Sequence, residues 1–172
     1  MGKDRISATV RTATVADLPA IFDIYNEQVL RGTATFDTEP KQLPRDTDWL
    51  TGRDPVRHPV IVAEVDGRVV GWGSLSQWST RCAYARAVEE SVYIHKDFRG
   101  RGLGRAIIAE LIERARAGGL GVLLARITSD NPGSVRLHEE FGFQRIGTMR
   151  RVGEKFGRIL DVELLDLHVD GR

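Results

Sequence analysis

A glycine-rich, basic turn joins a predicted strand to a predicted helix near the middle of this sequence. The run Arg99-Gly100-Arg101-Gly102-Leu103-Gly104-Arg105 alternates glycine with larger residues. The segment that follows has apolar residues at helical spacing and ends at Gly118-Gly119, which predicts a helix. A helix start offers unpaired N–H groups and a positive dipole end, and glycines let the backbone approach an anion closely. The turn therefore predicts a strand–loop–helix unit with a phosphate site in its loop.

Two common phosphate-binding motifs do not fit this turn. A Walker loop needs Lys-Ser or Lys-Thr after its last glycine, whereas Arg105-Ala106 follow here. A dinucleotide fingerprint needs Gly-x-Gly-x-x-Gly near the first strand, whereas this turn follows the fourth predicted strand with different spacing. A glycine-rich helix entry with solvated arginines remains the alternative to a specific anion site.

Apolar periodicity along the rest of the chain predicts the order β-α-loop-β-β-β-α-β-α-β-β. The fold class is therefore α/β (α+β), and the length favours one domain over residues 1–172. Asp17 is a candidate cap of the first helix. Asp66-Gly67 predicts a hairpin turn. The expected strands are 6–11, the two arms of the hairpin in 60–76, 87–95, 122–128, 143–149 and 161–168, with helices after 17, near 46–50, after 102 and at 131–141.

Composition excludes several classes of function. Lys plus Arg number 25 and Asp plus Glu 24, so the net charge of +1 is too small to favour binding of nucleic acid. A single cysteine, Cys82, rules out an internal disulfide, and no His/Cys/carboxylate spacing predicts a metal site. The first ten residues lack a signal-peptide core, and no apolar run approaches the roughly 20 residues of a membrane span. We therefore expect a cytoplasmic protein without metal, nucleic acid or membrane partners.

Three segments in order resemble the GNAT N-acetyltransferase superfamily. The Arg-Gly-x-Gly-x-Gly turn resembles its acetyl-CoA pyrophosphate loop, and "SVYI" resembles the strand whose bulge turns N–H groups toward the thioester. "NPGSVRLHEEFGF" resembles its later pattern, with His138 where most of the superfamily has tyrosine. The resemblance implies a central mixed β-sheet with a splayed strand pair flanked by helices. It also implies acetyl-CoA contacts from Val92, Tyr93, Ile94, Arg99, Gly100, Arg101, Gly102, Leu103, Gly104, Arg105, Asn131 and Ser134.

The resemblance is closer to one group, the phosphinothricin and methionine sulfoximine acetyltransferases. It rests on "TATFDTEP", "RCAYARAVEESVYI" and "VGEKFGRILDV", and it implies a homodimer. Cys82 stands where the group often has proline, and Ile159 where it usually has tryptophan. The expected reaction is direct transfer of acetyl to the α-amino group of a small amino-acid analogue. Another amine acceptor, such as a polyamine, an aminoglycoside or a protein amine, and a non-catalytic CoA-binding module remain the alternatives.

Acetyl transfer to an amine needs a base, an oxyanion donor and a proton for the thiolate. The resemblance places a substrate-contacting glutamate at Glu89, and partial burial would suit it as base. Strand alternation turns Glu90 to the opposite face, where we expect a solvated charge. Backbone N–H groups of residues 92–94 are the expected oxyanion donors. His138 either donates the proton, hydrogen bonds the sulfur or has only a structural role.

The substrate contacts are expected from two loops. Arg81 can bind a carboxylate bidentately, and Tyr84 can add a hydrogen bond. The intervening Cys82 and Ala83 belong to the same expected contact segment, although Cys82 has no nearby base to activate it. Phe36 either forms an apolar wall beside the substrate or packs in the core.

Overall fold

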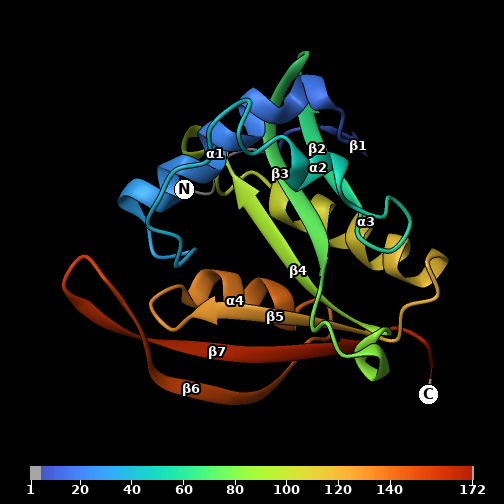
Figure 1. Ribbon diagram of the computed structural model, residues 1–172, viewed down its shortest axis with the longest axis vertical. Coiled ribbons are helices and arrows are strands. Elements are labelled where there is room, and N and C mark those ends of the chain that lie inside the picture. Colours follow the sequence, from blue (N-terminus) through green and yellow to red (C-terminus); the bar gives the residue numbers. More distant parts are fainter. Residues whose placement is uncertain (1–4, 172) are drawn as a thin grey trace.

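The computed structural model describes residues 5–171 as helices around one seven-stranded sheet (Figure 1). The sheet order is β1-β2-β3-β4-β5-β7-β6, and only β4 and β5 pair in parallel. The strands are β1 (Thr9–Thr12), β2 (Val60–Val65), β3 (Arg68–Gln77), β4 (Ala87–Ile94), β5 (Val122–Thr128), β6 (Gln144–Lys155) and β7 (Arg158–His168). Residues 1–4, on which part of the signal-peptide expectation rests, lie outside the described residues.

The helices follow the predicted order. They are α1 (Leu18–Arg31), α2 (Asp48–Thr51), α3 (Leu103–Ala117) and α4 (Pro132–Glu139), with short 3-10 helices η1 (Val15–Asp17), η2 (Cys82–Tyr84) and η3 (Lys96–Phe98). Asp66 and Gly67 have φ values of 49° and 76°, as a tight hairpin turn between β2 and β3 requires. The mixed α/β class and the element order are therefore confirmed.

Three local predictions were wrong. The first strand spans Thr9–Thr12 instead of 6–11. Asp17 does not cap α1 through its side chain; its carboxylate binds Arg11 at 2.8 Å and the N–H of Thr14 at 2.7 Å. The last two strands are longer than expected and meet at Phe156-Gly157, where φ is 53° and 69°. Phenylalanine at positive φ is uncommon, so this turn had no clear signal in the sequence.

The helices cover the sheet in two layers. Alternation along the strands turns one set of apolar side chains toward α3 and α4, including Ile61, Leu75 and Leu123, each 0% exposed. The other set, with Val62 and Trp72, packs against α1. Burial of both faces explains the near-continuous apolar runs in the central strands.

The strands β4 and β5 separate soon after they begin. Their parallel pairing covers only Ala87–Glu89 with Val122–Leu124. Beyond this point the two ribbons diverge in Figure 1, and α3 begins after the carboxyl end of β4. The predicted splayed strand pair is therefore present, and it leaves one edge of β4 without a neighbouring strand.

Candidate active site

The free edge of β4 presents backbone donors to the gap beside β5. The N–H of His95 donates to Val70, and that of Trp78 to Ala87, so odd-numbered residues of β4 exchange hydrogen bonds with β3. Because alternate residues of an antiparallel strand point their N–H groups to opposite sides, those of Val92 and Ile94 point into the gap. The strand therefore offers two backbone donors where the pairing with β5 has ended.

The bulge expected within residues 92–94 is absent. Pairing of β4 with β3 runs without a register shift from Val88 to Ile94. The donors are exposed because β5 turns away, and no local kink in β4 is needed. Tyr93 therefore directs its N–H toward β3 and only its neighbours face the gap.

The glycine-rich loop ends at the start of α3, as the sequence predicts. Gly100 and Gly102 have φ values of 78° and 89°, and Gly102 is the residue that caps the helix. A Cβ at Gly100 would meet no atom within 4 Å, so the loop has open space beside it. Both glycines adopt a conformation that strains other residues, and the open space beside Gly100 lies near the start of α3, where a helix dipole favours an anion.

The three arginines of this loop take different positions. Arg99 binds Glu27 of α1 at 2.8 Å and the carbonyl of Ile94 at 3.0 Å. Arg105 pairs with Glu140 beyond α4. The Arg101 guanidinium lies 5.6 Å from the Phe98 ring centroid, and its Nε is buried without a hydrogen-bond partner among the described residues.

The start of α4 contributes the other predicted cofactor residues. Asn131 caps this helix by accepting a hydrogen bond from the N–H of Ser134 at 3.2 Å. Gly104 lies against α4, since an added Cβ would be 3.1 Å from Leu137 Cδ2. Close packing of α3 on α4 therefore holds the loop and the Asn131–Ser134 turn in one rigid unit.

Glu90 is buried, so the expectation of a solvated charge was wrong. It is 6% exposed, and its Oε1 lies 2.6 Å from Nε2 of His138, which is 3% exposed. Nδ1 of His138 lies 2.7 Å from the carbonyl of Ser134. Burial opposes the charged form, but the charge and hydrogen bond of Glu90 and the Ser134 carbonyl together raise the pKa of His138. Because both ring nitrogens lie within hydrogen-bond distance of an oxygen, His138 joins α4 to β4.

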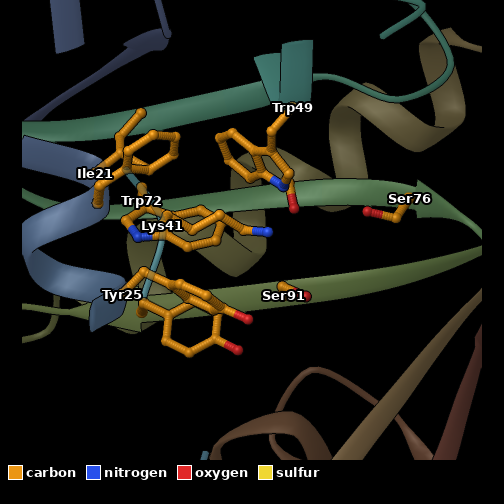
Figure 2. A pocket seen from close by; sticks show the side chains of 10 residues that line it. Ile21, Tyr25, Lys41, Trp49, Trp72, Ser76 and Ser91 are labelled. Carbon is orange, nitrogen blue, oxygen red and sulfur yellow. The ribbon is translucent and has the colours of Figure 1, made fainter. Parts of the chain in front are cut away.

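A pocket lies on the face of β3 and β4 that is turned away from α3 and α4, against α1 and α2 (Figure 2). Its cavity volume is about 100 Å³, and part of it is open to solvent. Figure 2 shows aromatic side chains gathered at one end, with Ser76 and Ser91 farther along the strands. The lining residues are Ile21, Phe22, Tyr25, Lys41, Trp49, Trp72, Ser74, Ser76, Ser91 and Tyr93.

Hydrogen bonds hold the aromatic end of the pocket in place. Tyr93 stacks on Trp72 with centroids 4.7 Å apart and donates to the carbonyl of Ala34 at 3.2 Å. Tyr25 donates to Asp37 at 2.7 Å. Burial raises the pKa of both tyrosines, so their hydroxyls stay neutral. Trp72 Nε1 is buried without a partner among the described residues, which leaves one donor available at the pocket.

Glu89 lies on the same face as this pocket. It is directly opposite Ser76 in the β3–β4 register, and alternation places Ser91 and Tyr93 on its side of the strand. Its carboxylate is held by Arg126 of β5, with Nε to Oε1 at 2.7 Å and Nη2 to Oε2 at 2.5 Å. Hydrogen bonds with Glu89 raise the pKa of Arg126 despite the opposing effect of burial.

The predicted substrate loops lie on the surface. Arg81, Cys82, Ala83 and Tyr84 are exposed on and beside η2, and none of them lines the pocket. Phe36 is 39% exposed and packs on β6, because a Cβ at Gly153 would be 2.2 Å from its ring. It therefore contacts the β6–β7 hairpin and does not form a wall of this pocket.

A family model for the GNAT acetyltransferases matches residues 18–143, which span the splayed strands, the glycine loop and α4. The chain belongs to the GNAT family.

Relatives of this GNAT protein match almost its whole length. An L-methionine sulfoximine/L-methionine sulfone acetyltransferase from Pseudomonas paraeruginosa is 42% identical over 166 residues, 96% of each chain. A phosphinothricin N-acetyltransferase from Alcaligenes faecalis is 38% identical over 94% of this chain and 82% of its own. The solved structure of a Salmonella typhimurium acetyltransferase with its cofactor acetyl-CoA superimposes with a TM-score of 0.92, at 37% identity over 97% of this chain and 96% of its own.

This GNAT protein is thus an acetyl-CoA-dependent acyltransferase, as the sequence resemblance implied. Its own residues fit that group. The gap beside β4 exposes N–H groups of Val92 and Ile94, and the positive-φ glycines leave a cradle at the start of α3. Acetyl-CoA can use both features. The free N–H groups of β4 suit its amides and thioester carbonyl, and the start of α3 suits its negatively charged pyrophosphate.

Arg126 and most of the pocket-lining residues of this GNAT chain were not predicted from the sequence. Trp72, Ser74 and Ser76 lie at alternate positions of a predicted strand, so a period of two would have placed them together on one face. Arg126 interrupts the apolar run of 122–128, which signals a side chain at an opening in the sheet.

Among residues 5–171 no group of three or more His, Cys, Asp or Glu side chains is arranged to hold a metal ion. Within the same range, no helix has both the length and the apolar character needed to cross a membrane.

Proposed function

We propose that this protein transfers the acetyl group of acetyl-CoA to the α-amino group of a small amino-acid analogue by direct attack. The observation that carries the proposal is the position of β4 between the gap beside β5 and the pocket against α1. Its free edge presents the N–H groups of Val92 and Ile94, and its other face bears Glu89 and the pocket-lining Ser91. An amine in the pocket would thus reach a thioester through the opening beside Glu89.

The size and lining of the pocket support a small acceptor. Its cavity volume of about 100 Å³ suits only a compact group, and its lining combines aromatic walls with three serines and Lys41. The relatives named for methionine sulfoximine, methionine sulfone and phosphinothricin make these compounds the acceptors to test. Each of them has an apolar stem and a polar oxidised head, which matches such a lining.

Bound acetyl-CoA supplies an acetyl thioester, whose C–S bond is replaced by a C–N bond. Glu89 takes a proton from the acceptor's ammonium so that the nitrogen lone pair is free to attack. The N–H groups of Val92 and Ile94 donate to the carbonyl oxygen as its negative charge grows. A second proton leaves the nitrogen as the amide forms, and the departing sulfur gains one.

His138 is the candidate donor of the proton that the sulfur gains. Its ring nitrogens lie 2.7 Å from the carbonyl oxygen of Ser134 and 2.6 Å from Oε1 of Glu90. It would therefore serve as proton donor only after one of these hydrogen bonds opens. In the alternative role, His138 fixes α4 and its Asn131 turn beside the pantetheine arm.

Release of free CoA tests the proposal. The purified protein is given acetyl-CoA with methionine sulfoximine, methionine sulfone or phosphinothricin, and turnover with at least one of them is expected. Thermal stabilisation by CoA without turnover of any of these or other amines would instead indicate a non-catalytic CoA-binding module. Turnover confined to a polyamine, an aminoglycoside or a protein amine would refute the amino-acid assignment.

Substitution of Glu89→Gln tests the base. We expect kcat/KM for the acceptor to fall by about 100-fold or more, as for removal of a general base, with acetyl-CoA affinity nearly unchanged. Glu113→Gln is the matched control, because it removes a carboxylate from an exposed ion pair with Arg116 on α3. Activity of Glu89→Gln near that of the control would exclude Glu89 as the base.

We also propose that residues 1–172 form a single catalytic domain that works as a homodimer in the cytoplasm. The single sheet from β1 to β7 supports one domain. The β6–β7 hairpin supports the dimer, since it exposes large apolar side chains of the kind that interfaces bury. These are Ile146, Val152, Phe156 and Ile159. Sedimentation velocity of the purified protein measures the oligomeric state.

A further inference from the structure

We propose that Arg126 binds the carboxylate of the acceptor, so that the Glu89–Arg126 pair recognises both charges of an α-amino acid. The inference deepens the proposed function and rests on it. Neither residue alone suggests it; the juxtaposition of an anion and a cation at the opening between β4 and β5 does.

The geometry places both side chains on the acceptor face of the sheet. Glu89 is opposite Ser76, which lines the pocket, and Arg126 reaches Glu89 from the neighbouring strand. Pairing between the two strands ends at Glu89 and Leu124, so the ion pair bridges them at the start of the gap. This is the position at which an amine must approach a thioester held by β4.

The ion pair keeps hydrogen-bonding capacity for a ligand. Arg126 uses Nε and Nη2 toward Glu89, which leaves the two N–H groups of Nη1 outside the pair. A carboxylate has about four lone-pair sites, and Arg126 occupies one on each oxygen. The pair can therefore stay formed while Glu89 accepts from an ammonium and Nη1 donates to a carboxylate.

Charge complementarity selects the class of ligand. An α-amino acid carries an ammonium and a carboxylate on the same carbon, with charges opposite to those of Glu89 and Arg126. An α-amino acid bound beside the pair would place its ammonium next to Glu89 and its carboxylate next to Arg126. An amine without a carboxylate would leave Arg126 with no new partner. The site should therefore prefer α-amino acids over simple amines.

Arg126 is better held for this task than Arg81. Its guanidinium lies 5.6 Å from the ring centroid of Trp78, and its side chain is 49% exposed. Stacking and the bidentate pair restrict its orientation, which lowers the entropy cost of binding a carboxylate. Arg81 lies on the exposed turn at η2, away from the pocket lining.

The test compares two acceptors that differ only in the carboxylate. These are methionine sulfone and its decarboxylated amine, assayed with wild type, Arg126→Gln, Arg81→Gln and the distant control Arg145→Gln. We expect Arg126→Gln to lower kcat/KM for methionine sulfone by about 10- to 100-fold more than it lowers kcat/KM for the amine, as for loss of a charge-assisted hydrogen bond. Arg81→Gln and Arg145→Gln should keep the preference of the wild type.

A second measurement tests binding of the carboxylate without turnover of an amine. The deaminated acid of methionine sulfone is measured as a competitive inhibitor, and Arg126→Gln should weaken its inhibition about as much as it weakens the acceptor. Equal loss with both acceptors would mean that Arg126 only positions Glu89, and loss of the preference in Arg81→Gln would assign the carboxylate there. Either result overturns the inference. If the wild type turns over no amino-acid acceptor, the proposed function itself fails.

Discussion

Gly100 and Gly102 show how single residues set the cofactor loop. Their positive φ values let the chain turn from η3 into α3, with open space beside Gly100 and the Arg5 side chain beside Gly102. For other residues this conformation costs about 1–2 kcal/mol of unfolding free energy. A substitution in the loop therefore has a backbone effect on stability that must be separated from its effect on binding.

Gly100→Ala should weaken acetyl-CoA binding beyond its effect on stability. Gly67→Ala is the matched control, because Gly67 has φ 76° against 78° at Gly100 and an added Cβ meets no atom within 4 Å at either. Both variants should lose about 1–2 kcal/mol of unfolding free energy. Only Gly100→Ala should raise the Kd for acetyl-CoA, by about fivefold or more if it loses one hydrogen bond. Calorimetric titration measures the Kd for acetyl-CoA of both variants. Equal Kd values for Gly100→Ala and Gly67→Ala would exclude the loop from phosphate binding.

At the scale of elements, the β6–β7 hairpin anchors the loop that follows α1. Lys155 is 4% exposed and donates to the carbonyls of Gln28 at 3.0 Å and Thr35 at 2.7 Å. Phe36 packs on Gly153 in the same hairpin. Because Tyr25 and Tyr93 also bind this loop, the hairpin indirectly steadies the aromatic end of the pocket.

Gly153→Ala should loosen this connection. Its methyl would lie 2.2 Å from the Phe36 ring, so the ring must move, at a cost of about 1–3 kcal/mol in unfolding free energy. Gly147→Ala on the same strand meets no atom within 4 Å and should change stability by less than about 0.5 kcal/mol. Urea unfolding measures both. A Gly153→Ala protein as stable as its control would show that Phe36 moves freely.

At the scale of the whole molecule, the buried His138–Glu90 pair links folding to pH. The folded pKa of His138 is raised above its ordinary value of 6.5, so the folded protein binds this proton more tightly than the unfolded chain. Its stabilisation is fully present below that ordinary value and is lost as pH rises through the raised one. The pair therefore makes the fold less stable toward alkaline pH.

Urea titrations between pH 6 and 9 should show this decline in unfolding free energy, a range set about the ordinary histidine value. Glu90→Gln should flatten the dependence, because it removes the charge that raises the pKa of His138. His168→Gln is the control, since His168 is exposed and its side chain pairs with Asp166 in the same strand. A wild-type profile as flat as that of Glu90→Gln would contradict the pairing.

Local chemistry explains which features were predictable from the sequence. The element order follows from periodicity within each segment, and the hairpin at Asp66-Gly67 from residues that favour positive φ. The glycine loop was found because its spacing and the helix after it lie within a few residues. The β6–β7 turn at Phe156-Gly157 was missed because phenylalanine rarely adopts this conformation.

The sequence alone therefore determined the fold class, the family resemblance and the expected anion loop, all of which depend on near neighbours in the chain. Tertiary structure decided which charges meet. Glu89 and Arg126 are 37 residues apart and Glu90 and His138 are 48 apart, so their pairing depends on strand register and on the packing of α4. Adjacent glutamates in one strand thus received different environments, an open acceptor face for Glu89 and a buried histidine for Glu90, because successive side chains of a strand point to opposite faces.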